Sequence, residues 1–155
     1  MTILEQVRQI VTEYGTSDAR RILEQTGVAL AYVPMANLRG IYKQIERNIF
    51  ISINSNLDER IQMLVAGHEL GHVVLHPGTN RVFLDRCTCL KTSPQERQAD
   101  TFSVCLLAPW PEDILEDGDT VDNIAAKLGV DIRLARLYAD EALKGGSNSG
   151  DIQHF

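Results

Sequence analysis

The chain has 155 residues, of which 44% are hydrophobic and 23% are charged, so it fits one folded domain with its own core and not a disordered segment. Its formal net charge of -6 argues against a general nucleic-acid binder, because neutralising phosphates requires a cationic surface. The sequence has no leader-like N-terminus and no apolar run of bilayer length, and its number of cysteines is odd. We therefore expect a cytoplasmic protein without membrane contact.

Two helices are predicted at the start of the chain. Apolar residues at helical spacing predict the first over residues 2–14, ended by Gly15. Ser17 or Asp18 can cap the second, which we expect to stop near residue 25. Neither helix carries a chemical motif, so we interpret both as packing elements.

Strand-like segments follow, over residues 28–35, 39–45 and 48–54. In the last of them three isoleucines share one face, namely Ile49, Ile51 and Ile53, while Phe50 and Ser52 take the other. These segments predict a small, mostly antiparallel sheet. Together with the helices on either side, they indicate an α+β fold.

A third helix carries the motif H-E-x-x-H. We expect it to begin at a capping box formed by Asn56 and Glu59 and to end near residue 76. His68 and His72 are four residues apart, so both imidazoles project from one face, about 6 Å apart along the axis, and can reach one ion. Glu69 is rotated away from the face that carries the two histidines, so it cannot easily be a third ligand. It can instead act on a water bound at the ion's open position.

His76 continues the four-residue spacing, but it lies about 12 Å of helical rise from His68, too far for both to bind one ion with His72. We interpret it as a helix-end or outer group. Gly67 and Gly71 lie in the interior of this helix, where each glycine lowers helix stability by about 1 kcal/mol relative to alanine. A close approach of another backbone would explain them, and packing against the sheet is the simpler alternative.

Residues 80–90 are predicted to be a loop or a short strand. Cys87 and Cys89 within it could complete a closed, structural Cys2His2 zinc site with the two histidines. The alternative is that they are unligated thiols and that a carboxylate from the next helix takes the third position.

That next helix is capped by Ser93, has Pro94 at its first position and ends at Pro109. Glu96 and Asp100 lie on one of its faces, one turn apart. Taken alone, Glu96 is explained as a favourable acid at a helix N-terminus.

The rest of the chain is predicted to contain a short acidic helix over 112–118 and a helix-turn-helix-like hairpin over 121–144, with Gly129 in its turn. The hairpin's charges cancel, so packing or partner docking is favoured over autonomous DNA binding; they are Lys127, Arg133, Arg136 and Lys144 against Asp122, Asp131, Asp140 and Glu141. We expect one domain over 1–144 and a flexible tail over 145–155, in which His154 is incidental.

Several motifs together resemble the ImmA/IrrE family of metallopeptidases. They are His68-Glu-Leu-Gly-His72-x-x-x-His76, preceded by Ile51-Ser-Ile-Asn54 and followed by Glu96-x-x-Ala-Asp100-x-Phe102 and Leu106-Leu-x-Pro109. They cover roughly residues 48–110 in the order and spacing of the family. The cysteines of residues 87–89 are not part of this pattern.

The resemblance implies a zincin-like fold and a role for each motif residue. His68, His72 and Glu96 would bind one Zn²⁺, Glu69 would be the general base, and Asp100 would accept a histidine N–H. Many family members belong to prophages or integrative elements, where they cleave or relieve a helix-turn-helix repressor, and others activate stress responses by cutting a repressor. The implied partner is a repressor encoded nearby.

We therefore expect a zinc endopeptidase whose substrate backbone adds to the sheet edge at the strand carrying Ile49, Ile51 and Ile53. The main alternative is a zinc-containing module that binds and sequesters a regulator without cutting it. A DNA-binding regulator is disfavoured by the charge balance. The sequence does not identify the residue that would stabilise the oxyanion. It also does not indicate the oligomeric state.

Overall fold

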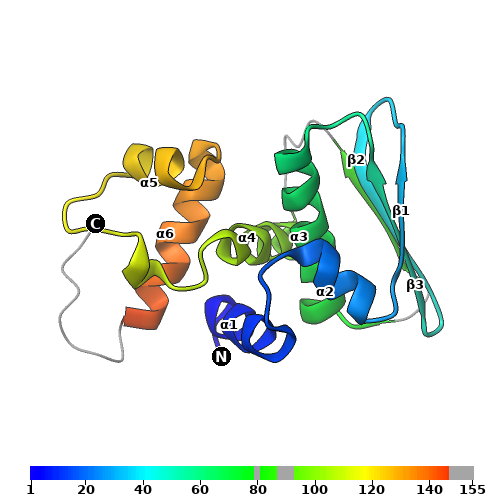
Figure 1. Cartoon of the computed structure of the whole chain (residues 1–155), viewed down its shortest axis with the longest axis horizontal. Helices are drawn as coiled ribbons and strands as arrows, with labels where there is room; N and C mark the ends of the chain where they lie inside the picture. Colours follow the sequence, from blue (N-terminus) through cyan, green and yellow to red (C-terminus); the bar gives the residue numbers. More distant parts are fainter. Residues whose placement is uncertain (79–80, 87–92, 147–155) are drawn as a thin grey trace.

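The computed structural model describes residues 1–78, 81–86 and 93–146, and within them the helices lie on one side of a four-stranded sheet (Figure 1). The helices are α1 (Ile3–Tyr14), α2 (Ala19–Gln25), α3 (Glu59–Leu75), α4 (Pro94–Leu107), α5 (Val121–Leu128) and α6 (Ile132–Gly146). The strands are β1 (Ala29–Val33), β2 (Leu38–Ile45), β3 (Asn48–Asn54) and β4 (Arg81–Arg86). None of the helices in these ranges is long and apolar enough to cross a bilayer.

The sheet has the strand order β1-β3-β2-β4. The pairs β3/β2 and β2/β4 are antiparallel, and β1 runs parallel to β3. The predicted α+β fold with a mostly antiparallel sheet is thus confirmed. The alternation in β3 is also as predicted, since Ile51 and Ile53 are fully buried and Phe50 is exposed.

The predicted position of β3 at a sheet edge is wrong. β3 lies between β1 and β2 and is hydrogen-bonded on both sides, so no peptide can add to it. Ile51 and Ile53 face the core, and Ile49 packs against it. The edges of the described sheet are β1 and β4.

Helix starts follow the capping signals, with one shift. Thr2 forms a capping box with Glu5 at the start of α1, and Asp18 caps α2. The cap of α3 is Asp58, which accepts from the amide of Ile61 at 2.9 Å, and not the predicted Asn56. Both residue types can cap a helix, but a carboxylate also interacts favourably with the positive end of the helix dipole.

The acidic segment after α4 forms less helix than predicted. Only Pro111–Asp113 is helical, as one 3-10 turn. A regular helix over 112–118 would place Glu112 beside Glu116, and like charges four residues apart repel each other. The amide of Glu116 instead bonds the side chain of Asp119, which closes a turn at 2.9 Å. The hairpin that follows has the predicted Gly129 turn.

Helices α3 and α4 cross at unusually short range. A Cβ atom at Gly71 would lie 3.0 Å from Cα and 3.1 Å from the carbonyl oxygen of Ala99, and one at Gly67 would lie 3.1 Å from Cα of Ser103. The hydroxyl of Ser103 also bonds the carbonyl of Leu64 at 2.6 Å. The two glycines therefore allow the close approach of another backbone, the first of the two explanations considered above.

We expect Gly71→Ala to lower the free energy of unfolding by roughly 1–2 kcal/mol, because overpacking against a fixed backbone outweighs the gain in helix propensity. Urea unfolding monitored by circular dichroism measures the difference. Gly145→Ala in α6 is the matched control, because nothing lies within 4 Å of its added methyl group, and it should be neutral or slightly stabilising. A Gly71→Ala protein as stable as the wild type would show that the helix crossing tolerates a side chain.

Candidate metal centre

Three side-chain donors converge between α3 and α4. Nε2 of His68 lies 3.0 Å from Oε2 of Glu96, and Nε2 of His72 lies 3.0 Å from Oε1 of the same residue. The two Nε2 atoms are 3.2 Å apart. Zinc ligands at about 2.0–2.2 Å in a tetrahedral arrangement are separated by about 3.3 Å. The three donors thus already have the separation that one zinc ion requires.

Local sequence explains how each donor reaches this point. The four-residue spacing places His68 and His72 on one face of α3, within the stretch 65–72 that is buried on all sides. Ser93 caps α4 by accepting from the amide of Glu96 at 3.2 Å, which sets Glu96 in the first turn. One turn later Ala99 meets Gly71, and this contact brings the start of α4 over the histidines.

The charge states at the centre are strongly coupled. Burial raises the pKa of Glu96, but hydrogen bonds from His68 and His72 outweigh this effect and hold that pKa well below its usual range. Burial lowers the pKa of His68, but its hydrogen bonds to Asp100 and Glu96 raise it well above the ordinary value. The anionic pocket therefore stabilises positive charge at the position where a cation would bind.

Asp100 binds the ring nitrogen of His68 that does not face Glu96. Its Oδ1 accepts the Nδ1–H of His68 at 2.7 Å, which leaves Nε2 directed at Glu96 and His72. Its Oδ2 accepts from the guanidinium group of Arg133 on α6. The structure thus brings Asp100 to His68, one of the two motif histidines, whereas the resemblance implied a contact to a histidine N–H without naming which histidine.

Glu69 is completely buried beside the donors, and neither of its carboxylate oxygens has a hydrogen-bond partner among the described residues. Burial raises its pKa to about 8, an effect that the nearby His68 partly opposes. A Cβ atom at Gly40 of β2 would lie 3.2 Å from Oε1 of Glu69, so this glycine leaves room for the carboxylate. Burying an acid without a hydrogen-bond partner is energetically costly, and a role in binding or catalysis would explain why the group is present.

Strand β4 contributes two residues that the sequence patterns did not single out. The ring of Phe83 stacks on His72 with centroids 4.2 Å apart and an angle of 6°. A carboxylate oxygen of Asp85 lies within 4.8 Å of donor atoms of His68 and Glu69, and burial raises the pKa of Asp85. Alternation along 81–86 puts Phe83 and Asp85 on one face, which was the available signal.

Other candidate residues are not part of the donor set. His76 caps the end of α3, and its Nε2 donates to the carbonyl of Gln95 at 3.2 Å, in line with the predicted helix-end position. Cys87, Cys89 and His154 lie outside the described residues, so the predictions for them stay open.

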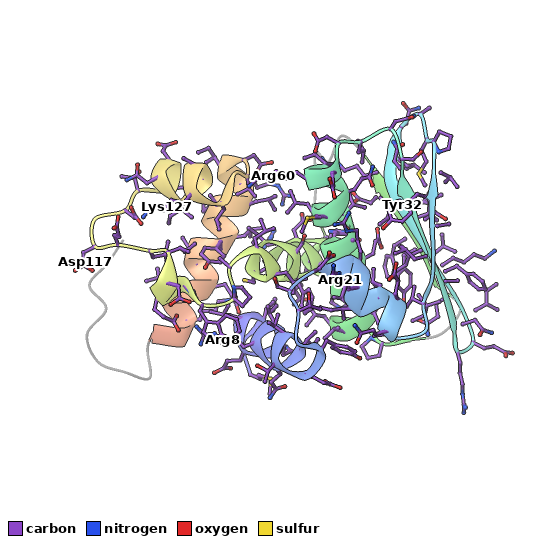
Figure 2. The ribbon with its side chains drawn as sticks, viewed as in Figure 1. Arg8, Arg21, Tyr32, Arg60, Asp117 and Lys127 are labelled. Carbon is purple, nitrogen blue, oxygen red and sulfur yellow. The ribbon has the colours of Figure 1, made fainter. Side chains whose placement is uncertain are left out.

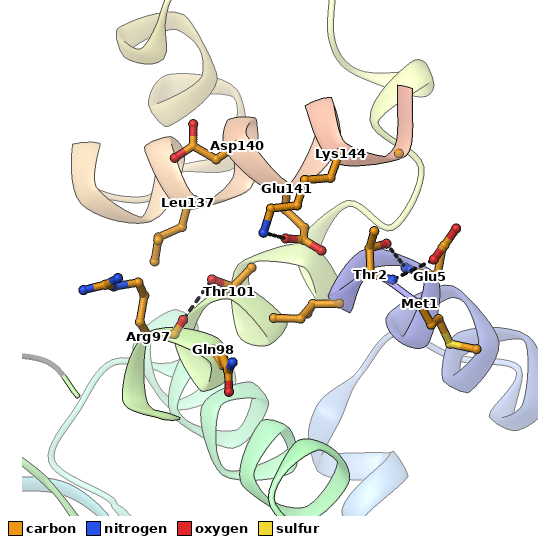
Figure 3. Close-up of a pocket in the computed structure, with 12 residues that line it drawn as sticks. Met1, Thr2, Glu5, Arg97, Gln98, Thr101, Leu137, Asp140, Glu141 and Lys144 are labelled. Atoms are coloured by element: carbon orange, nitrogen blue, oxygen red, sulfur yellow. Dashed lines mark hydrogen bonds and ion pairs between the residues drawn. The ribbon is translucent and has the colours of Figure 1, made fainter. Parts of the chain in front are cut away.

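Cavity size does not identify the centre. A hollow of about 910 Å³ lies between α1, α4 and α6, and it contains none of the predicted site residues (Figure 3). In its wall the carboxylate of Glu141 accepts from Lys144 and from the amide of Leu4, which ties α6 to α1. A smaller cavity of about 200 Å³ lies next to His68, lined in part by Asp85, Asp100 and Arg133.

The family model of the IrrE N-terminal-like domain, a peptidase family, matches residues 23–136. The chain belongs to this family. The resemblance to ImmA/IrrE metallopeptidases is thereby confirmed, and the match includes all of the donors, Glu69 and the first turn of α6. The chain is also 34% identical over 141 residues, 89% of each chain, to an uncharacterized immunity region protein 2 of Bacillus phage phi105.

The raised pKa of Glu69 predicts a pH dependence of the metal-free protein. Between its ordinary value of 4.5 and about 8, this group keeps a proton in the folded state and loses it in the unfolded state. Its contribution to the free energy of unfolding therefore falls as the pH rises through this window. Glu69→Gln cannot lose the proton, so at pH 8 it should be more stable than the wild type by roughly 1–4 kcal/mol.

Urea unfolding in the presence of a chelator, at several pH values from 4.5 to 8.5, tests this expectation. The stability difference between Glu69→Gln and wild type should grow steadily with pH. Glu13→Gln, at an exposed position of α1, is the control and should show no such trend. A Glu69→Gln protein that follows the wild type at every pH would contradict the expectation.

Proposed function

We propose that this protein is a zinc-dependent endopeptidase that cleaves a specific regulatory protein. The observation that carries the proposal is a buried carboxylate without a partner, Glu69, beside three donors spaced for one ion. Two imidazoles and one carboxylate leave a fourth coordination position open, as in catalytic zinc sites. The metallopeptidase family to which the chain belongs supports the same function.

The charges around the centre fit a divalent ion. Four carboxylates, those of Glu69, Asp85, Glu96 and Asp100, gather here with two guanidinium groups, those of Arg39 and Arg133. With all four carboxylates ionised and both histidines neutral, the net charge here is two negative charges, which a divalent cation would balance. A bound cation would itself favour the ionised form of Glu69 over the protonated form of the metal-free protein. Nitrogen and carboxylate donors together are typical of zinc sites, while magnesium and calcium prefer oxygen alone.

In the proposed mechanism, His68, His72 and Glu96 would hold the ion, and the ion would supply Lewis-acid polarisation of water and of the peptide carbonyl. Glu69 takes a proton from the attacking water at one of its free oxygens and delivers it to the leaving nitrogen. Asp100 fixes the ring orientation of His68. Phe83 restricts the ring of His72 by stacking on it.

The substrate would approach along β4. This strand is an edge of the described sheet and carries Asp85 beside His68 and Glu69, so an extended peptide paired with its outer side would lie near these two residues. Edge pairing at β4 replaces the pairing at β3 that the sequence had suggested.

A repressor is the substrate class we propose. The phage relative is named as an immunity region protein, and the ImmA/IrrE resemblance associates such enzymes with helix-turn-helix repressors. We propose that this chain acts in the cytoplasm on a repressor encoded near its own gene, without contacting nucleic acid directly. Sequestration of the repressor without cleavage is the alternative that the experiment below distinguishes.

Incubation of the purified protein with the neighbouring repressor should give discrete fragments in zinc and none in a chelator. Glu69→Gln should retain one zinc per chain and lose cleavage by about 10²–10⁴-fold, because it keeps the ligands but cannot accept the proton. Zinc content is measured by atomic emission and cleavage by mass spectrometry.

Glu13→Gln provides a matched control with the same chemical change on the surface, and it should cleave normally. Stable complex formation without fragments in the wild type would support sequestration over proteolysis. Undiminished cleavage by Glu69→Gln would exclude Glu69 as the base.

A further inference from the structure

The carboxylate of Asp100 is shared between the metal centre and the C-terminal hairpin. Its Oδ1 accepts the Nδ1–H of His68, and its Oδ2 accepts from the guanidinium group of Arg133. Asp100 lies on α4, whereas Arg133 lies in the first turn of α6, 33 positions later in the sequence. Because each oxygen has its own donor, the carboxylate cannot rotate without breaking one of the two contacts.

The position of Arg133 is not explained by its own helix. A cation in the first turn is unfavourable, because the N-terminal end of a helix carries partial positive charge. Asp131 already caps this end by accepting from the amide of Leu134 at 2.9 Å. The contact with Asp100, which is largely buried, accounts for an arginine at this position, and it offsets part of the cost of burying that carboxylate.

The hairpin is fixed well enough to place this side chain. The guanidinium group of Arg60, at the start of α3, donates to the carbonyl of Leu128 at the end of α5 and lies between the two elements (Figure 2). The hydroxyl of Tyr138 on α6 donates to the carbonyl of Ala108, just after α4, at 2.7 Å. The hairpin is thus tied to both helices that carry the proposed ligands.

We propose that Arg133 is a positioning residue of the metal centre. Building on the zinc site proposed above, Arg133 holds the carboxylate of Asp100 in the orientation that accepts the Nδ1–H of His68. This interaction fixes the ring of His68 with Nε2 directed at the ion. The first turn of α6 is therefore a functional part of the metal centre, in addition to its packing role.

Removing Arg133 could change the zinc affinity in two opposite directions, depending on whether its charge or its positioning of Asp100 matters more. A guanidinium group near a cation repels it, so its removal on charge grounds alone would strengthen zinc binding. Loss of the orientation of Asp100 and His68 would weaken zinc binding, as the loss of such outer partners generally does. A decrease in affinity on removal of the positive charge therefore identifies positioning.

Zinc affinity is measured by competition with a chromophoric chelator for the wild type, Arg133→Gln, Asp100→Asn and the double variant. We expect Asp100→Asn to weaken binding by about 10–100-fold and Arg133→Gln by about 3–10-fold. In the Asp100→Asn background, Arg133→Gln should cause no further loss. The visible spectrum of the cobalt-loaded Arg133→Gln protein should also differ from that of the wild type.

Arg136→Gln is the matched control. It removes the same charge one turn further along α6, from an exposed side chain, and should leave zinc affinity unchanged or slightly higher. Arg133→Lys keeps the charge but loses the planar donor pair, so its affinity should lie between those of Arg133→Gln and the wild type. Thermal unfolding of the metal-free proteins checks that each variant is folded.

The outcomes separate this inference from the function on which it rests. A wild-type protein that binds no zinc would overturn the proposed function. A wild type that binds zinc, with Arg133→Gln binding as tightly or more tightly, would overturn only the role of Arg133. The same holds if Arg136→Gln weakens binding as much as Arg133→Gln, or if the losses from Arg133→Gln and Asp100→Asn simply add.

Discussion

The short crossing of α3 and α4 is the constraint on which the rest of the structure depends. The donors of the candidate centre come from two helices, and the backbone contact between Gly71 and Ala99 sets the distance between them. A side chain at either glycine of α3 would push α4 outward, and Glu96 and Asp100 would move together, because both project from the same face of α4. The cost of glycine in a helix interior is thus offset by the contacts that the close approach permits.

The close packing of α3 and α4 brings several carboxylates together, and this arrangement requires nearby positive charge or bound protons. Glu69, Glu96, Asp85 and Asp100 are gathered in a partly or fully buried region, where isolated carboxylates are unfavourable. Hydrogen bonds from the histidines and Arg133 stabilise Glu96 and Asp100 as anions, whereas burial raises the pKa of Glu69 and Asp85. The same region therefore contains acids held ionised and acids that bind protons readily. Such a division is expected where one set binds a cation and another takes part in proton transfer.

Local periodicity determines where the predicted site residues lie. The spacing of His68 and His72 requires only a helix, and a well-capped helix start places Glu96 and Asp100 on one face. The roles of Glu96 and Asp100 at the site were predicted only from the resemblance to the ImmA/IrrE family. The sheet edge was wrong because strand order depends on long-range pairing: β1 adds in parallel beside β3 and moves it to the interior. Asp85 and Arg133 were missed for a related reason. Each reaches the centre through tertiary contacts with segments more than a dozen residues away, and neither belongs to a motif with recognisable spacing.

The family match extends from the motif-bearing part of the chain into the hairpin. The motifs noted in the sequence end near residue 110, whereas the match continues through α5 and ends at residue 136, just past Arg133. Helix α1 lies outside the match and contacts the segment after α4 and the second half of α6, where Arg8 donates to the carbonyl of Pro109 at 2.8 Å and Glu141 accepts from the amide of Leu4. The contact between Arg133 and Asp100 lies near the start of α4 and of α6, whereas the contacts with α1 lie near the ends of these two helices. The orientation of His68 then depends on the packing of α6 as well as on α4, although no residue of the hairpin is a proposed ligand.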